Sequence, residues 1–317
     1  MVRLRWRRCA AFCSTPTLLW ASPAPTSTTA SLSRSRSRIR SFPVELVTTV
    51  NGNTDVDTAT RLSLRLLERL GHGDVPVARG AATPLVGGWT RGGLRVERVD
   101  APVPGHAAVR IVERVMAEPG ELSIVAIGPL TNVALALALE PRVATSVAEI
   151  VVMGGMYLGQ TNVAAVPGEF NFWVDPHAAA EVLASGAPIR AVGLDVTRRV
   201  RMTREHVAWL AESGSDFGRF AASCAEGWIA HLEQTTDQRD SCALHDPLAV
   251  ASLAYPDLVI WRPARVAVET SGAHTRGVAV ADLLTTPDAG PANCRIAVDV
   301  DAPAFLDLFL GRIATLG

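Results

Sequence analysis

Short apolar runs alternate with amphipathic segments along this chain from about residue 42 onward. Continuous apolar runs predict buried strands, and apolar residues at helical spacing predict helices. Strands are predicted at 44–50, 75–78, 122–127, 149–153, 189–194, 258–268, 278–280 and 296–300. Helices are predicted at 55–70, 107–116, 130–139, 176–183, 203–212, 216–233, 246–254 and 302–313. This alternation predicts an α/β fold with a mostly parallel open sheet flanked by helices, and the absence of a repeat or long linker predicts one domain over residues 42–317.

Residues 1–41 have a different composition. They hold eight Arg and many Ser, Thr and Pro, with Ser and Arg alternating over 33–38, and the first acidic residue of the chain is Glu45. Disorder is the simplest prediction for such an atypical segment. A processed, transit-type leader is an alternative, whereas the polar residues 14–17 within the weakly apolar run argue against a secretory signal.

Overall composition excludes several function classes. The net charge of −1 gives no reason to expect a nucleic-acid partner, and no apolar run approaches the about 20 residues of a membrane span. Five Cys form an odd number without metal-binding spacing, which is typical of reduced thiols and predicts a cytoplasmic protein. The chain contains no Lys, a bias that a GC-rich gene explains.

Polar side chains gather where the predicted strands end and helices begin, which is where open α/β sheets bind ligands. They occur in Asn51-Gly52-Asn53, Gly128-Pro129-Leu130-Thr131-Asn132, Met153-Gly154-Gly155, Asn162, Glu169-Phe170-Asn171, Asp195, Thr197 and His245-Asp246-Pro247. Each motif alone is explained by a turn or a helix cap, and His245 alone would be structural. Together they predict a binding site. No G-x-G-x-x-G follows the first strand, which argues against a Rossmann oxidoreductase.

In this order the motifs resemble those of the inosine–uridine preferring nucleoside hydrolases, over residues 43–317. The resemblance implies hydrolysis of the N-glycosidic bond of ribonucleosides to base and ribose, with Ca²⁺ at the strand ends. Ca²⁺ takes oxygen ligands and can activate a water, and carboxylates suit an oxocarbenium-like transition state. Small-molecule ribonucleosides are then the partners, and a homodimer or homotetramer is a family expectation.

The resemblance also assigns roles to residues. The Thr131 carbonyl and Asp246 would bind calcium. His245 would donate a proton to the departing base. The ribose hydroxyls would be held by Asn53, Asn162, Glu169 and Asn171, with Met153 packed nearby.

Three features depart from the family pattern. The family expects D-x-D-x-G-x-D-D after its first strand, which supplies the catalytic base and most of the calcium charge, and this motif is absent here. The spacing from Asn162 to Glu169 is one residue longer than usual. The loop at 87–93 lacks the His often found there, and His106 is displaced from that position.

A shifted reading frame explains the missing motif. Read one base out of frame with G or C at third positions, Cys13-Ser14-Thr15-Pro16-Thr17 becomes Leu-Leu-Asp-x-Asp and Thr28-Thr29 becomes Asp-Asp. The Ser/Arg alternation at 33–38 becomes a Leu/Ala alternation typical of an apolar helix. We therefore interpret residues 1–41 as a frameshifted Asp cluster, with a genuine Arg/Ser leader as the alternative.

Three hypotheses follow for function. The chain is a nucleoside hydrolase whose activity and stability are impaired by the missing Asp cluster. Alternatively, it is a non-catalytic member that binds nucleosides or ribose through Glu169 and Asn171. The third is an organelle-targeted or secreted form with a processed leader.

Overall fold

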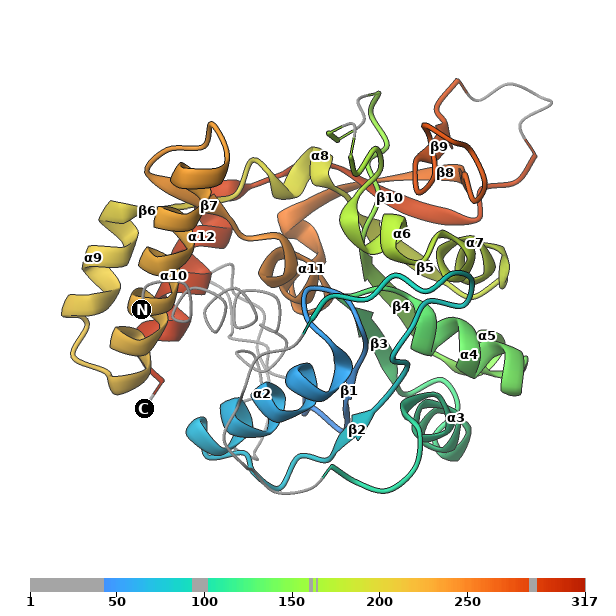
Figure 1. The fold of residues 1–317 in the computed structure, drawn as a ribbon, viewed down its shortest axis with the longest axis horizontal. Coiled ribbons are helices and arrows are strands. Elements are labelled where there is room, and N and C mark those ends of the chain that lie inside the picture. The colour runs from blue at the N-terminus through green and yellow to red at the C-terminus, as the bar shows by residue number, and fades with distance from the viewer. Residues whose placement is uncertain (1–42, 93–101, 160–161, 164, 285–289, 317) are drawn as a thin grey trace, which may run out of the picture.

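The computed structural model describes residues 43–92, 102–159, 162–163, 165–284 and 290–316 of the chain (Figure 1). The predictions for residues 1–41 lie outside the described part. A six-stranded sheet has the order β3 (Ser123–Ala126), β4 (Glu149–Met153), β5 (Ile189–Val192), β10 (Cys294–Val300), β8 (Val259–Val268) and β9 (Ala279–Asp282). Pairing is parallel from β3 to β10 and antiparallel from β10 to β9. The predicted α/β class with a mostly parallel sheet is confirmed.

Strand β1 (Val47–Thr49) pairs in parallel with β2 (Val77–Arg79) in a separate two-stranded sheet that lies beside β3. The sequence predicts a strand over 44–50, but only its middle forms. Among the described residues β1 has a partner on the β2 side alone, so its ends lack the second ladder that would hold them extended.

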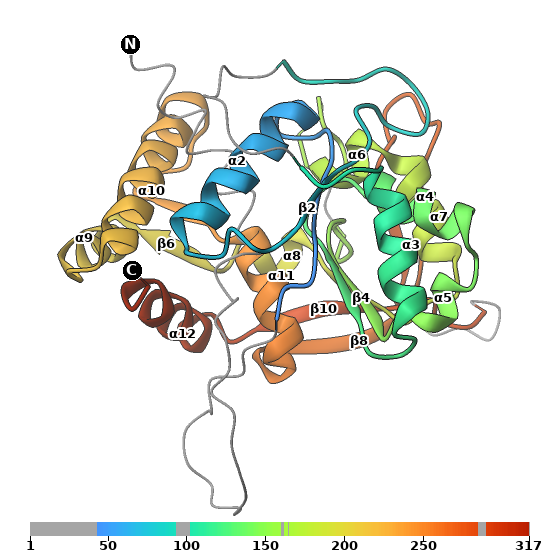
Figure 2. The same cartoon turned by 90° about the horizontal axis from the view of Figure 1, so that it is seen from below.

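Helices cover both faces of the sheet (Figure 2). Residues of β4 alternate between two apolar cores, because successive side chains of a strand point to opposite faces. Ile150 and Val152 face α3 (Ala107–Ala117), α4 (Thr131–Leu139) and α7 (Pro176–Ala184). Val151 and Met153 share the other core with α2 (Val56–Arg69), α9 (Arg204–Glu212), α10 (Asp216–Thr235), α11 (His245–Ala254) and α12 (Ala302–Ala314). None of the described helices is long and apolar enough to cross a bilayer.

Several short elements escape the sequence prediction because they are too short to show a period. They are the helices α5 (Val143–Ser146), α6 (Phe170–Val174) and α8 (Leu194–Thr197), the 3-10 turn η2 (Pro256–Leu258) and the antiparallel pair β6 (Arg201–Thr203) and β7 (Ser241–Ala243). The strand predicted at 189–194 stops at Val192, because Gly193 and Leu194 open helix α8. Two of these short helices contain predicted site residues: α6 includes Asn171, and α8 includes Asp195 and Thr197.

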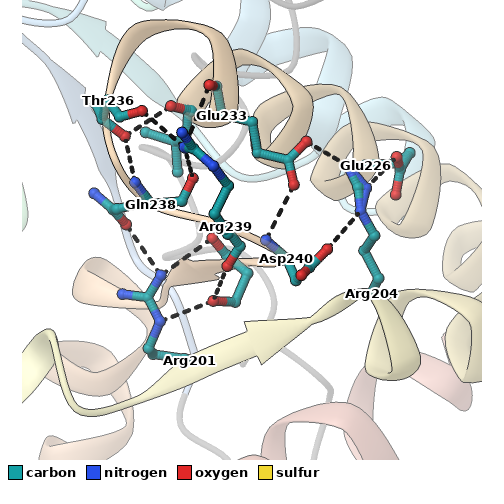
Figure 3. Close-up of polar contacts among 10 residues, drawn as sticks. Arg201, Arg204, Glu226, Glu233, Thr236, Gln238, Arg239 and Asp240 are labelled. Atoms are coloured by element: carbon teal, nitrogen blue, oxygen red, sulfur yellow. Dashed lines mark hydrogen bonds and ion pairs between the residues drawn. The ribbon is translucent and has the colours of Figure 1, made fainter.

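A network of charged side chains fixes the turn between α10 and β7 (Figure 3). Arg204 forms ion pairs with Glu226 at 3.1 Å and with Glu233 at 2.8 Å. Glu233 also accepts the backbone N–H of Asp240, which has a φ of 53°. Arg201 donates to Ser241 Oγ at 2.9 Å. This network holds the chain just before α11, where the predicted site continues.

Candidate functional site

Glu169 is the N-cap of helix α6 and is almost completely buried. Its Oε1 accepts the N–H of Asn171 at 2.9 Å, and its Oε2 accepts the N–H groups of Phe172 at 3.1 Å and Gly155 at 3.3 Å. Burial raises the pKa of Glu169 to about 7, against the opposing effect of these backbone donors. The cap therefore fixes a carboxyl group that changes charge near neutral pH.

Asn171 connects this cap to the carboxyl end of β4. Its Nδ2 donates to the Met153 carbonyl at 3.0 Å and to the Ile127 carbonyl at 3.3 Å, and it lies 3.6 Å from Met153 Sδ. Asn171 and Met153 are both buried. The structure thus brings together three predicted site residues from two different motifs, with the Asn171 amide oriented by two backbone carbonyls.

Thr131 and Asn132 open helix α4 and fasten it to neighbouring loops. Thr131 Oγ1 donates to Asp175 Oδ2 at 2.7 Å, and Asn132 bridges the Thr49 carbonyl at 2.9 Å and the Ala81 N–H at 2.9 Å. A Cβ at Gly80 would lie 2.5 Å from the Thr49 carbonyl oxygen, so this close approach requires glycine. These contacts hold the ends of β1, β2 and β3 together.

His245 begins helix α11 and contacts α8. Its Nδ1 lies 2.7 Å from Thr197 Oγ1, which fixes the orientation of the ring. Burial lowers the pKa of His245 to about 4, and the charges of Arg198 and Arg201 lower it further. The imidazole is therefore neutral at pH 7.

Asp246 is buried next to His245, on the same turn of α11. Burial raises its pKa well above the ordinary value, and the nearby charge of Glu169 raises it further. Two buried acids from helices far apart in the sequence therefore influence each other at the carboxyl edge of the sheet. Such a pair favours protonation or a bound cation.

These opposite pKa shifts predict that the stability of the protein depends on pH. The variants Glu169→Gln and His245→Asn each remove one of the two titrating groups, so they separate the two contributions. Glu169 has a folded-state pKa above its unfolded value, so its contribution to stability grows as pH falls from about 7 toward 4.5. His245 has a depressed folded-state pKa, so its contribution is lost as pH falls from about 6.5 to 4.

When the pH is lowered from 7.5 to 5, we therefore expect the stability of His245→Asn to rise relative to that of the wild-type protein. The stability of Glu169→Gln should fall relative to that of the wild-type protein. Denaturant midpoints at both pH values measure the difference. Parallel profiles for all three proteins would contradict the assigned shifts.

The remaining predicted residues are Asn53 and Asn162. Asn53 is exposed in the turn after β1 and, with Asn171, lines a groove of about 760 Å³ between β1 and β3. Asn162 Oδ1 accepts a hydrogen bond from Arg198 Nη2 at 2.8 Å, at the end of α8 that also carries Thr197. Asn162 and His245 are therefore linked through α8 rather than through the Glu169 cap.

The described residues do not fit the predicted calcium site. In this part of the chain no group of three or more His, Cys, Asp or Glu side chains could hold a metal ion. The Glu169 oxygens are already engaged by backbone donors. Asp246 and the Thr131 carbonyl are too few hard ligands for Ca²⁺.

Sequence reasoning missed an aromatic cluster beside the Glu169 cap. Trp89, from the loop after β2, packs edge-on against Phe170 and Trp173 of α6, with ring centroids 5.7 Å and 5.5 Å away. The Trp89 carbonyl accepts from Asn51 Nδ2 at 3.1 Å. The position of Phe170 directly after Glu169 was the only signal in the sequence, since Trp89 lies in a Gly-rich loop without periodicity.

The chain is similar in sequence to several known proteins. The family model described as inosine-uridine preferring nucleoside hydrolase matches residues 36–307. The pyrimidine-specific ribonucleoside hydrolase RihA of Klebsiella pneumoniae is 35% identical over 283 residues, which cover 86% of this chain and 90% of the relative. A probable uridine nucleosidase of Oryza sativa is 38% identical over 246 residues, which cover 73% and 75%.

Solved structures show the same fold. The plant nucleoside hydrolase PpNRh1 superposes with a TM-score of 0.78 at 28% identity, covering 86% of this chain and 91% of that one. A purine-preferring ribonucleoside hydrolase from Gardnerella vaginalis gives a TM-score of 0.77 at 30% identity, with 86% and 90% covered.

Proposed function

Since the chain belongs to the inosine-uridine preferring nucleoside hydrolase family, we propose that its site binds ribonucleosides and that its hydrolysis of the N-glycosidic bond is impaired. The family acts on ribonucleosides, and this chain retains the corresponding motifs at the carboxyl edge of its sheet. The observation that carries the proposal is the Glu169 cap, whose backbone donors and Asn171–Met153 hydrogen bond form a rigid polar unit next to Asp246.

Each retained side chain has a chemical use toward a nucleoside. Asn171 donates through Nδ2 to the backbone, so its Oδ1 is the acceptor that it can offer to a ribose hydroxyl. The Glu169 carboxylate adds negative charge where an oxocarbenium-like transition state would gain positive charge. His245 is neutral at pH 7, so in the free protein it offers a hydrogen bond to the base rather than a charged proton donor.

The impairment follows from the missing carboxylates. Hydrolysis needs a group that activates water. Both oxygens of Glu169 already accept hydrogen bonds from backbone N–H groups, and burial raises the pKa of Asp246 well above its ordinary value. In the described part of the chain no acidic cluster assists them. We therefore expect nucleoside binding to survive better than turnover.

Base preference and biological context belong to the same proposal. The two similar sequences carry names that specify pyrimidine nucleosides or uridine, whereas one of the similar structures is named as purine-preferring. Uridine, cytidine and inosine are therefore the substrates to compare. Nucleobase salvage in the cytoplasm by a homodimer or homotetramer is the corresponding expectation.

Calorimetric titration with uridine tests the binding part of this proposal. We expect Asn171→Ala to weaken binding at least about 10-fold, as loss of one good hydrogen bond to a buried partner does. Gln234→Ala, an exposed residue on α10, is the matched amide control and should leave binding unchanged. Chromatography of the same samples detects free base.

The outcomes separate the two functional hypotheses. Binding with slow base release supports an impaired hydrolase, and binding with no release supports the non-catalytic alternative. Equal affinity of the Asn171→Ala and wild-type proteins, or no binding of any of the three nucleosides, contradicts the proposed site.

A further inference from the structure

Thr197 is the residue of helix α8 that contacts His245. Its side chain is completely buried, and its Oγ1 lies 2.7 Å from His245 Nδ1. This is the one side-chain hydrogen bond that Thr197 makes among the described residues. Figure 2 shows α8 beside α11, the helix that His245 begins. The imidazole is therefore oriented by a hydroxyl from a different helix.

Hydrogen bonds on both sides of α8 hold this helix in place. Asp195, in its first turn, accepts the N–H groups of Tyr157 at 2.7 Å and Leu158 at 3.0 Å, which ties α8 to the loop after β4. Beyond the other end of α8, the Val200 carbonyl accepts the N–H of Leu244, the residue before α11, at 2.9 Å. The backbone therefore fixes the distance between the hydroxyl and the imidazole.

The surroundings of the Thr197 hydroxyl determine the direction of this hydrogen bond. A hydroxyl has one hydrogen to donate, and a buried O–H without an acceptor is costly. Among the described contacts, His245 Nδ1 is the acceptor that this hydrogen can reach. The separation of 2.7 Å is typical of a hydroxyl donor, whereas N–H donors usually lie about 2.9–3.0 Å from an oxygen. His245 Nδ1 is therefore the acceptor and carries no hydrogen.

The other ring nitrogen of His245 then carries the hydrogen. A neutral imidazole has one hydrogen shared between two nitrogens, and the hydrogen bond at one nitrogen sets the state of the other. Nε2 has no hydrogen-bond partner among the described residues, and the half-buried ring leaves it available to a ligand. The charges of Arg198 and Arg201 oppose a second proton on the ring. The site therefore holds a neutral Nε2–H donor.

We propose that Thr197 is a positioning residue, which holds His245 in the tautomer that presents an Nε2–H donor to the base of a bound nucleoside. This role rests on the proposed function, in which the base lies against His245. A donor selects a base with an acceptor at that point, such as a carbonyl oxygen of uracil or a ring nitrogen of a purine. The hydrogen bond stabilises negative charge on the base while the imidazole stays neutral.

NMR of the ring nitrogens in protein labelled with ¹⁵N-histidine tests the tautomer without a nucleoside. The signals that disappear in His245→Asn belong to His245. In the wild-type protein at about pH 7.5, we expect a single tautomer with hydrogen on Nε2 and none on Nδ1. This measurement needs no other variant, so it decides the tautomer even where a substitution of Thr197 prevents folding.

Variants of Thr197 separate the hydroxyl from the packing of the side chain. Thr197→Val removes the hydroxyl and should shift the Nδ1 signal of His245, whereas Thr197→Ser keeps the hydroxyl and should keep the wild-type signal. Ser252→Ala is the matched control, because it removes another buried hydroxyl of α11 that bonds only the Ala249 carbonyl among the described contacts. It should leave both ring-nitrogen signals unchanged.

Titration with uridine connects the tautomer to binding. We expect Thr197→Val to weaken uridine binding about 5-fold, the scale of one hydrogen bond, and Thr197→Ser and Ser252→Ala to bind like the wild-type protein. Hydrogen on Nδ1 in the wild-type protein overturns the proposal, as does an unchanged Nδ1 signal or an unchanged affinity in Thr197→Val. No uridine binding by the wild-type protein contradicts the proposed function instead, and the ring-nitrogen signals still decide whether Thr197 sets the tautomer.

Discussion

A protein translated from the same gene with residues 1–41 read one base out of frame is expected to hydrolyse uridine at least about 10³-fold faster than the chain as written, because a positioned general base alone contributes about 10²–10⁴-fold. With G or C at third codon positions, the shifted frame would supply a cluster of Asp residues that this chain lacks. Those carboxylates would provide the base and the hard ligands that Asp246 and Thr131 cannot provide by themselves. Release of uracil in the presence of Ca²⁺, measured for both proteins, gives the ratio.

The expected gain in activity follows from the gap between β1 and β3. The groove between β1 and β3 leaves two strand edges and Ser63 without partners in the described part of the chain. A strand there would fill this space and end near Asn171, which also lines the groove. Carboxylates at the end of that strand would then lie at the carboxyl edge of the sheet, close to Glu169 and its neighbour Asp246.

The control is the frame-shifted protein with its new Asp residues changed to Asn. It should fold as well as the frame-shifted protein and hydrolyse uridine no faster than the chain as written. The hypothesis fails if the nucleotide sequence yields no Asp cluster in the shifted frame. It fails equally if the chain as written already turns over uridine at the rate of the frame-shifted protein.

Asp175→Ala is expected to lower the free energy of unfolding by about 3–5 kcal/mol, because it leaves several buried donors without an acceptor. Asp175 is fully buried. It accepts hydrogen bonds from Thr131 Oγ1 at 2.7 Å, from Leu85 N at 2.8 Å and from Ala178 N at 3.0 Å. One carboxylate therefore joins the loop after β2, the start of α4 and the start of α7.

Asp301→Ala is the matched control. Asp301 is also an N-cap in front of a helix with Pro in its first turn, but it is exposed and accepts only the Ala304 N–H, at 3.0 Å, among the described contacts. Its replacement should cost about 1 kcal/mol, the usual value for a lost cap. Urea unfolding of both variants measures the difference. Equal losses would show that Asp175 acts as an ordinary cap and does not hold the loops together.

Local sequence patterns predicted the elements that are long or continuously apolar. The run at 149–153 forms β4 with exactly these bounds, and 130–139 and 302–313 form helices shifted by a residue or so at their ends. The pattern failed for the strand at 44–50, which forms only at Val47–Thr49. An apolar run indicates that a strand can form. The length of that strand depends on neighbouring strands, which the pattern does not reveal.

The site shows the same division. Glu169 and Asn171 stand out in the sequence as a motif two residues apart, and a cap explains their spacing. The approach of Asn171 to Met153, of His245 to Thr197 and of Trp89 to Phe170 joins segments distant in the chain. Their meeting depends on the order of strands in the sheet, which no local period encodes.

By itself the sequence determined the α/β class, the family motifs in their order and the acid-free segment at residues 1–41, because each of these is a property of neighbouring residues. The tertiary structure decided which backbone donors orient Glu169 and that Asp246 lies close enough to Glu169 for their charges to interact. It also decided that a groove separates β1 from β3. These depend on burial and on backbone pairing across the fold. The charge state of the two acids, and the absence of a second strand partner for β1 among the described residues, are therefore set by topology rather than by the residues alone.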